Sequence, residues 1–340
     1  MEILALIPAR SGSKSIKDKN IRFFKNIPLI AHSIITSKET KLITRIIVST
    51  DSEKYAKIAQ DYGAEVPFLR PKSISNDKST DIELFQHALM WLKKHENYTP
   101  DVCVHLRPTH PIRDPKDIDA MIEMLLKDDS VDSVRSISIE NKTPYKMWQM
   151  NEYNELKPVA SCNIPEAYNM PRQILPTVYS QNGSIDVIRT TTITEKKSMT
   201  GDIIKGYVTP INCDIDTEPD FIKAERFSEL LDMKNGSKKI FCFDIDGVIA
   251  TKVRDNNYKE STPIKPTIEI INRLYDMGHT IILNTARGFK TGIDWTEYTK
   301  KQLSSWGVKY SVIYFNKPNA DFYIDDKLIE LEDIINEGVN

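Results

Sequence analysis

A short basic segment follows the first apolar stretch of this 340-residue sequence. From Arg10 to Lys19 it carries four cationic side chains, separated mainly by serines and a glycine. Small side chains let the backbone approach a ligand, so this segment can direct N–H groups and positive charge at a triphosphate. The Walker A pattern GxxxxGK[ST] is absent, and a solvated basic turn has a similar composition. Phosphate binding and a plain surface turn both fit these residues.

Polar side chains follow apolar stretches again near the end of the chain. In chain order they are Asp244, Asp246, Thr285, Lys317, Asp325 and Asp326. In α/β folds the carboxyl ends of the strands form the edge at which ligands bind, so we expect these side chains to lie together. Carboxylates repel a phosphate group, so a phosphate site among them requires a metal ion and the charge of Lys317. The pattern therefore predicts a ligand site at this sheet edge.

The elements that must position these residues alternate along the whole chain. Short β-branched stretches alternate with amphipathic ones, which is typical of α/β proteins with mostly parallel strands. Asp114 is a predicted helix N-cap, since Pro115 follows it and apolar residues then recur at helical spacing. In the first part of the chain we expect strands at Ile3–Ile7, Arg45–Ser49, Val102–Leu106 and Ser133–Ile137.

Two domains are expected, because domains usually hold about 100–200 residues. The polar stretch Met233–Lys239 contains a glycine and a serine and predicts the boundary, giving domains at residues 1–232 and 239–340. Just before it, Thr217–Asp220 has the form of a capping box that opens a helix. Beyond the boundary we expect strands at Ile240–Phe243, Thr280–Leu283 and Phe322–Ile324, and helices at Thr267–Met277 and Thr296–Trp306.

The composition argues against several classes of protein. Lys+Arg 46 against Asp+Glu 48 gives a net charge of −2, so no overall field draws the chain to nucleic acid or to an anionic membrane. No apolar run reaches the about 18 residues of a membrane span, and the first residues lack an export signal, so we expect a cytoplasmic protein. The four cysteines lack CxxC spacing, which predicts reduced core thiols rather than a zinc site or disulfides.

The basic segment and several later blocks resemble one enzyme family. Ile7–Asn20 resembles the signature loop of the CMP-sugar synthetases, the cytidylyltransferases that activate N-acylneuraminate and ketodeoxyoctonate. Blocks similar to the same family follow in the same order at Val48–Ser52, Tyr62–Pro71, Arg107–Arg113, Pro171–Gln173, Gln181–Ser184 and Asp214–Thr217. The resemblance implies a Rossmann-like nucleotidyltransferase domain that transfers CMP from CTP to an acidic sugar and releases pyrophosphate.

The same resemblance implies roles for individual residues. The residues expected at CTP are Arg10, Ser13, Lys14, Lys19, Asn20 and Arg70. Their cations would neutralise the charge that develops as a hydroxyl attacks and pyrophosphate leaves, and Lys19 is the expected catalytic member. Asp214 and Asp216 are expected to bind Mg²⁺, although a loop carboxylate and a helix cap would also explain them. The cations expected against the acceptor carboxylate are Arg107, Lys146 and Arg172.

Some residues depart from the family pattern. In the signature loop, Ser11 and Ser15 replace the usual glycines and Lys17 replaces a common proline. On the acceptor side, sialate-activating members tend to have Gln, Ser and Arg at the positions held here by Arg107, His110 and Ser180. A ketodeoxyoctonate-like or other non-sialate acceptor is therefore an open alternative. His110 is a candidate base, with packing or hydrogen bonding as the competing interpretation.

The late set of polar residues is similar to the haloacid dehalogenase-like phosphatases, over residues 239–340. This implies that Asp244 forms an aspartyl-phosphate and that Asp246 protonates the leaving alcohol and then activates water. Thr285 and Lys317 would bind the phosphoryl oxygens. The expected Mg²⁺ ligands are Asp244, Asp246, Asp325 and Asp326. Because few residues separate Asp244 from Thr285, we expect a small, minimally capped Rossmannoid domain.

Together the two resemblances imply an α/β, bifunctional, Mg²⁺-dependent enzyme of surface polysaccharide biosynthesis. The N-terminal domain would transfer CMP from CTP to a nonulosonate, a sialic-acid-like sugar acid, and the C-terminal domain would hydrolyse a phosphate ester of the sugar precursor. The family resemblance implies a homodimer or higher homo-oligomer, without nucleic acid or membrane partners. In the alternative, the C-terminal domain is only an oligomerisation module.

Overall fold

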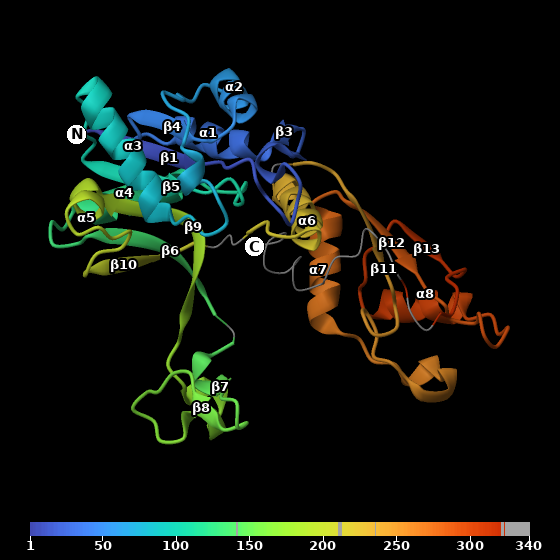
Figure 1. Ribbon diagram of the computed structural model, residues 1–340. Helices are drawn as coiled ribbons and strands as arrows, with labels where there is room; N and C mark the ends of the chain where they lie inside the picture. The colour runs from blue at the N-terminus through green and yellow to red at the C-terminus, as the bar shows by residue number, and fades with distance from the viewer. Residues whose placement is uncertain (141, 210–212, 235, 321–322, 324–340) are drawn as a thin grey trace. The chain divides into compact units, whose positions relative to one another are not determined.

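The computed structural model describes residues 1–140, 142–209, 213–234, 236–320 and 323 (Figure 1). The chain divides into two compact units, Met1–Ala224 and Glu225–Asn340. Helix α6 (Glu218–Lys234) runs across this division. The domain limits 1–232 and 239–340 therefore stay a prediction.

The N-terminal unit is built on a mixed six-stranded sheet with the order β10-β6-β9-β5-β1-β4. Its strands are β1 (Ile3–Pro8), β4 (Arg45–Ser49), β5 (Val102–Leu106), β6 (Ser133–Ile139), β9 (Tyr179–Arg189) and β10 (Ile204–Val208). All four strands expected here are confirmed. Strand β1 pairs in parallel with β4 and β5, and β6 pairs in parallel with β10.

The expectation of mostly parallel strands is confirmed, with β9 as the exception in this sheet, because it runs antiparallel to both β5 and β6. The chain leaves the sheet at the end of β6, makes a long excursion and returns beside the strand that it left. A strand that re-enters at the same edge must run in the opposite direction. Figure 1 shows the excursion, here called the arm (residues 140–178), reaching away from the sheet and carrying the hairpin of β7 (Trp148–Met150) and β8 (Leu156–Pro158).

Helices cover both faces of this sheet. One face packs against α1 (Leu29–Glu39), α2 (Glu53–Asp61) and α4 (Pro115–Leu126), and the other against α3 (Asp81–Glu96) and α5 (Thr190–Thr194). The predicted start of α4 is confirmed, since the Asp114 side chain accepts the Lys116 N–H at 2.9 Å. Shorter elements are β2 (Phe23–Phe24), β3 (Ile27–Pro28), η1 (Lys19–Ile21), η2 (Lys72–Ile74), η3 (Pro144–Lys146), η4 (Ala167–Asn169) and η5 (Arg172–Ile174).

The C-terminal unit contains a parallel three-stranded sheet with the order β11-β12-β13. Its elements are β11 (Ile240–Phe243), η6 (Arg254–Asn256), η7 (Tyr258–Glu260), α7 (Lys265–Asp276), β12 (Thr280–Asn284), α8 (Thr296–Ser305) and β13 (Val312–Tyr314). The two helices and first two strands expected here are confirmed. Of the strand expected at Phe322–Ile324, residues 322 and 324 lie outside the described residues, and Tyr323 is not assigned to a strand. Strand β13 was not expected, because its three half-buried or exposed residues give little pattern.

Two further expectations concern cysteines and membranes. The prediction of core thiols holds for Cys103, which is buried, but Cys162 and Cys213 are half-buried and Cys242 is exposed on β11. An apolar sequence neighbourhood did not ensure burial, because alternate residues of a strand face opposite sides of the sheet. Within the described part of the chain, no helix combines the length and apolar character needed to cross a bilayer.

Candidate functional site

The basic segment lies at the carboxyl edge of the N-terminal sheet. Strands β4 and β5 flank β1 on opposite sides, so the chain reverses its direction of winding at β1. The segment begins directly after β1, at such a topological switch point, where α/β folds bind ligands. Ser11 joins it to the end of β4, since its N–H and hydroxyl donate to Asp51 at 2.8 and 2.9 Å. The expected nucleotide loop is therefore fixed at the edge where this class of fold places its ligands.

Lys19 is the most strongly positioned cation of the loop. Its side chain is buried, and its ammonium group donates to the Ile215 carbonyl at 2.9 Å and to Asp216 Oδ1 at 3.0 Å. The segment that carries Ile215 is in turn held to the loop after β5, because the Ile215 N–H donates to the Thr109 carbonyl at 2.9 Å. The fold thus joins a lysine and a carboxylate that are 197 positions apart in the chain.

The capping residue of α6 is Thr217, and this leaves Asp216 for another role. The Thr217 N–H and hydroxyl donate to the Asp220 carboxylate at 2.8 and 2.7 Å, and the Thr217 hydroxyl accepts the Asp220 N–H at 3.4 Å. The expected capping box is therefore confirmed. The alternative in which Asp216 serves as the helix cap is wrong.

Arg10 and Lys14 lie closer to solvent and share a carboxylate. Arg10 Nη1 lies 2.6 Å and Lys14 Nζ 2.5 Å from the Asp77 carboxylate. Ser13, which precedes Lys14, is half-buried. Asn20 is buried, and its amide nitrogen donates to the Arg10 carbonyl at 2.9 Å. Asn20 therefore stabilises the conformation of the loop. The Asp77 carboxylate provides the negative charge beside Arg10 and Lys14 that a bound phosphate would also provide.

Arg70 is a buried cation without a hydrogen-bond partner at two of its nitrogens. The residue is only 5% exposed, and neither Nε nor Nη2 has a hydrogen-bond acceptor among the described residues. Burial lowers the pKa of Arg70, and the nearby Asp51 carboxylate partly opposes this effect. A buried donor normally has a partner. The unsatisfied guanidinium of Arg70 therefore fits an anionic or carbonyl oxygen supplied by a ligand.

Arg107 is held by internal partners on two sides. Its Nη1 donates to the Gly183 carbonyl at 2.9 Å and to Asp186 at 3.0 Å, and its Nη2 donates to Asp81 at 2.8 Å. Buried His105 lies between the same two carboxylates, 3.7 and 3.9 Å away. These contacts make Arg107 a link between β5, β9 and the start of α3. The predicted contact with an acceptor carboxylate stays a prediction.

His110 lies beside the expected metal ligands but is a poor candidate for a base. Its Nδ1 is 3.5 Å from Asp214, and burial together with Arg113 lowers its pKa to about 3. The half-buried Arg113 donates to the Ser184 carbonyl at 2.9 Å and to the Ser33 hydroxyl at 3.0 Å. Proton transfer is most efficient when the pKa of the group is near the operating pH. The packing and hydrogen-bonding interpretation of His110 is therefore favoured.

The two remaining predicted acceptor residues lie on the arm. Lys146 belongs to η3 and Arg172 to η5, and both side chains are exposed. Arg107, by contrast, follows β5 within the sheet. The structure thus places the three cations on two parts of the N-terminal unit, and their joint role stays a prediction.

Asp214 and Asp216 suit a magnesium ion that is shared with a substrate. Mg²⁺ is usually bound by one or two carboxylates together with waters and substrate phosphates rather than by a closed set of protein ligands. In the described residues, no group of three or more His, Cys, Asp or Glu side chains gathers as a metal site. Burial raises the pKa of Asp214, and a nearby divalent cation would favour its ionised form. Two carboxylates beside the predicted nucleotide loop fit Mg²⁺.

Acid is expected to destabilise the N-terminal unit through His105. Burial, assisted by Arg107, lowers the pKa of His105 from 6.5 to about 4. Between these values the unfolded chain binds a proton that the folded chain does not, so stability falls as the pH drops from 6.5 towards 4. His105 should contribute a slope of about 1.4 kcal/mol per pH unit. Urea unfolding at several pH values in this range measures the free energy of unfolding. That free energy should change less steeply with pH in His105→Gln than in the wild type. The control variant His95→Gln replaces an exposed histidine and should keep the pH dependence of the wild type. Equal pH dependence in the wild type and both variants would show that His105 does not cause the acid effect.

The C-terminal unit brings its predicted polar residues to the carboxyl edge of its own sheet. Asp244 follows β11, Thr285 follows β12 and Lys317 follows β13. Lys317 Nζ lies 2.8 Å from Asp244 Oδ2, and the Lys317 N–H donates to the Thr285 carbonyl at 3.3 Å. Thr285 is fully buried, whereas the Asp244 side chain is 33% exposed. Asp325 and Asp326 lie outside the described residues.

Asp246 has a partner that the sequence did not indicate. Arg287 donates through Nε and Nη2 to the Asp246 carboxylate at distances between 2.7 and 3.1 Å. The turn that follows Asp246 depends on Gly247, whose φ of +96° is a conformation that side-chain-bearing residues rarely adopt. Its N–H donates to the Ala250 carbonyl at 2.6 Å. The pair of Asp246 and Arg287 thus joins the segment after β11 to the segment after β12.

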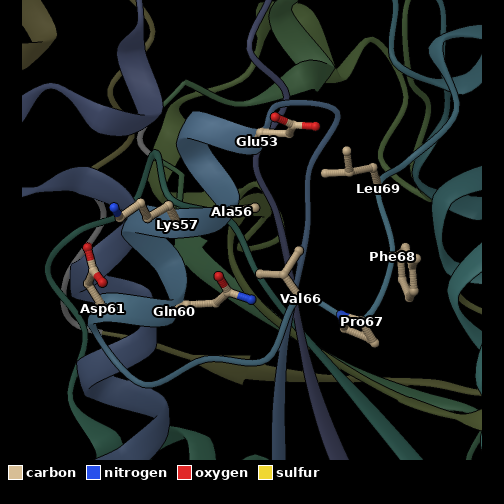
Figure 2. A pocket seen from close by; sticks show the side chains of 9 residues that line it. All are labelled: Glu53, Ala56, Lys57, Gln60, Asp61, Val66, Pro67, Phe68 and Leu69. Atoms are coloured by element: carbon tan, nitrogen blue, oxygen red, sulfur yellow. The ribbon is translucent and has the colours of Figure 1, made fainter.

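Two surface hollows flank helix α2 of the N-terminal unit. One, of about 560 Å³, lies between α2 and residues 66–69, and Figure 2 shows Ala56 and Gln60 on the helix side and Val66 to Leu69 opposite. The other, of about 540 Å³, is bordered by Lys17, Arg22 and Lys54 among others. The linings of both contain none of the residues predicted to bind nucleotide. The candidate site therefore rests on the arrangement of its side chains at the sheet edge.

Several charged residues at the two edges have no counterpart in the sequence-based prediction. They are Asp51, Asp77, Asp81, Asp186 and Arg287. Asp77 lies seven positions beyond Arg70, in a polar turn with no motif of its own. Arg287 stands two positions after Thr285, so its place at a strand end was the one available signal.

Comparison with known proteins matches most of the chain. The model of the cytidylyltransferase family covers residues 4–240. The chain is 34% identical over 234 residues to the CMP-N,N'-diacetyllegionaminic acid synthase of Legionella pneumophila, 68% of this chain and 97% of that protein. It is 33% identical over 242 residues to the protein of the same name from Campylobacter jejuni, 71% and 99% of the two chains.

A solved structure shares the fold at low sequence identity. The CMP:2-keto-3-deoxy-manno-octonic acid synthetase complexed with CTP superposes with a TM-score of 0.51 and 14% identity, over 67% of this chain and 99% of that one. The likeness shows a shared nucleotidyltransferase fold of the Rossmann-like α/β class. Residues beyond 240 lie outside the family match.

Proposed function

This chain belongs to the cytidylyltransferase family, and from that premise we propose that it transfers CMP from CTP to a nonulosonate sugar acid and releases pyrophosphate. One observation carries the proposal: buried Lys19 is held by Asp216 and by the Ile215 carbonyl at the carboxyl edge of β1. A desolvated ammonium group fixed in this way stabilises developing negative charge without having to reorganise.

In the proposed reaction the acceptor hydroxyl oxygen attacks the α-phosphorus of CTP. The new P–O bond forms as the bond to the β-phosphate oxygen breaks, pyrophosphate takes the electron pair, and the hydroxyl proton passes to solvent. Arg10, Lys14 and Lys19 neutralise the triphosphate, and buried Arg70 supplies two unsatisfied N–H donors. Asp214 and Asp216 are the residues that would hold Mg²⁺. When bound, Mg²⁺ supplies further neutralisation of the phosphate oxygens.

The acceptor is proposed to be a nonulosonate because the similar proteins are named for CMP-N,N'-diacetyllegionaminate synthesis. Arg107, His110 and Ser180 depart from sialate-activating members, so a ketodeoxyoctonate-like sugar is the competing acceptor. Pyrophosphate release from CTP should be measured with N-acetylneuraminate, a diacetamido nonulosonate and ketodeoxyoctonate. A preference for ketodeoxyoctonate would replace the nonulosonate assignment.

We further propose that the C-terminal unit hydrolyses a phosphate ester, supported by Asp244 and Lys317 meeting at 2.8 Å beside Thr285. Asp244 would form a P–O bond as the ester bond breaks, and the leaving oxygen would take a proton from Asp246. A water molecule would then give a proton to Asp246 and bond to phosphorus, which frees Asp244 and orthophosphate. Asp244, Asp325 and Asp326 are the proposed Mg²⁺ ligands, whereas Asp246, the fourth residue predicted to bind the metal, pairs with Arg287 and keeps the proton-transfer role in this proposal. Lys317 would balance the charge that a phosphate meets beside Asp244.

The two proposed activities suit consecutive steps in making one activated sugar, in which a sugar phosphate loses its phosphate before it is joined to CMP. A homo-oligomer in the cytoplasm is part of this proposal. With Mg²⁺, the purified protein should release orthophosphate from the phosphate ester of the acceptor that it activates. If orthophosphate is not released, the alternative of a C-terminal oligomerisation module is favoured.

Replacing Asp77 should strengthen CTP binding. Its carboxylate occupies Arg10 and Lys14, so a triphosphate must displace it before it can bind those cations. Because exposed ion pairs of this kind are weak, Asp77→Asn should lower the KM for CTP by no more than about fivefold. Steady-state pyrophosphate release measures this effect. Asp129→Asn, which removes an exposed carboxylate paired with Arg189, should leave the KM unchanged. A raised KM in Asp77→Asn would show that Asp77 supports the loop instead.

A further inference from the structure

Arg287 is one of the most completely bonded side chains in the described part of the C-terminal unit. The residue is only 3% exposed. Its Nε and Nη2 donate to Asp246, and its Nη1 donates to the Thr299 hydroxyl at 3.2 Å and to Gln302 Oε1 at 2.8 Å. The Asp246 side chain remains 23% exposed. The guanidinium is therefore fixed on its inner side and presents its outer side to a carboxylate that solvent can reach.

The neighbours of Arg287 restrict it further. Its guanidinium lies over the Tyr258 ring at 4.6 Å, and Gln302 Nε2 donates to the Tyr258 carbonyl at 3.0 Å. The Arg287 N–H donates to the Thr285 hydroxyl oxygen at 3.1 Å. One residue thus contacts both Asp246 and Thr285, which come from different strand ends. A planar, bidentate arginine–carboxylate pair of this kind fixes the orientation of the carboxylate more tightly than a lysine–carboxylate pair would.

We propose that Arg287 is the positioning residue for Asp246, holding its carboxylate toward the leaving-group oxygen of a phosphate ester. The inference rests on the proposed phosphatase reaction and adds a residue to it. In that reaction the ester P–O bond breaks as the leaving oxygen takes the proton of Asp246. Arg287 does not touch the ester and acts only through the orientation of the Asp246 side chain.

This role differs measurably from a purely structural one. An ester whose leaving group departs as a stable anion needs little proton donation, whereas an alkoxide leaving group needs it strongly. If Arg287 acts through Asp246, its loss must harm the second kind of ester far more than the first. If the ion pair only ties two loops together, both kinds should suffer equally.

The test measures orthophosphate release by the full-length protein with Mg²⁺ from 4-nitrophenyl, phenyl and benzyl phosphate. For Arg287→Met, kcat should fall by about 100-fold or more on benzyl phosphate and by less than about fivefold on 4-nitrophenyl phosphate. Arg287→Lys should recover part of the benzyl phosphate rate. The exposed neighbour variant Lys300→Met should match the wild type on all three esters.

A double-mutant cycle and two gentler variants complete the test. Asp246→Asn should give the same selective loss, and the double variant should be no slower than Asp246→Asn alone, because residues that act as a unit are not additive. Thr299→Val and Gln302→Leu leave Arg287 in place and should show a smaller loss of the same kind, which keeps the test valid if Arg287→Met does not fold. Equal losses on all three esters would overturn the positioning role of Arg287 but leave the phosphatase proposal standing. A wild-type protein inactive on every ester would overturn the phosphatase proposal with it.

Discussion

Replacing Lys19 by alanine should lower the turnover of cytidylyl transfer by about 100-fold or more. The ammonium group is buried and fixed by Asp216 and the Ile215 carbonyl, so it would meet the proposed triphosphate without a competing hydration shell. Loss of one preorganised donor to a developing oxyanion commonly costs about 10²–10³ in kcat. Asp216→Ala should cause a loss of similar size, because it removes both the partner of Lys19 and a proposed Mg²⁺ ligand.

Pyrophosphate release at saturating CTP and acceptor measures this effect. Lys17→Ala is the matched control, since Lys17 is an exposed cation of the same loop. It should keep turnover close to that of the wild type. Thermal unfolding should separate lost chemistry from lost folding in the Lys19 variant. A loss of tenfold or less in both Lys19→Ala and Asp216→Ala, with folded proteins, would mean that the transfer site lies elsewhere.

Replacing Asp244 by asparagine should abolish orthophosphate release and leave cytidylyl transfer intact. An amide oxygen cannot act as the nucleophile that the carboxylate provides, and Lys317 would lose its partner at 2.8 Å. The isosteric change keeps the packing around β11. Both products, orthophosphate and pyrophosphate, should be measured on the same preparation.

The surface variant Asp276→Asn is a suitable control, because Asp276 pairs with Lys309 in an exposed ion pair of the same unit. It should keep both activities. If Asp244→Asn left every activity unchanged, the C-terminal unit would be better explained as an oligomerisation module. If it reduced both activities together, the assignment of separate sites to the two units would fail.

The sequence by itself determined six strands of the two main sheets, namely β1, β4, β5, β6, β11 and β12, and the polar residues that follow them. The strand Val102–Leu106 and the helix capped by Asp114 depend on local patterns of apolar and capping residues, which act within a few positions. The positions of Lys19 and Asp244 at sheet edges followed from the same reasoning, because parallel strands place their carboxyl ends together. The antiparallel direction of β9 did not follow, since it depends on where a long excursion returns.

Only the tertiary structure decided which charges meet. Asp77 reaches Arg10 across 67 positions, and Arg287 reaches Asp246 across 41. Arg107, predicted to contact the acceptor, pairs with Asp81 and Asp186, and no local pattern indicated either partner. Neither partner of such a pair carries a local signal, because an ion pair depends on the distance between side chains in space and on the water that packing excludes. Residue types thus predicted phosphate chemistry, and the tertiary structure decided which partners orient the predicted side chains.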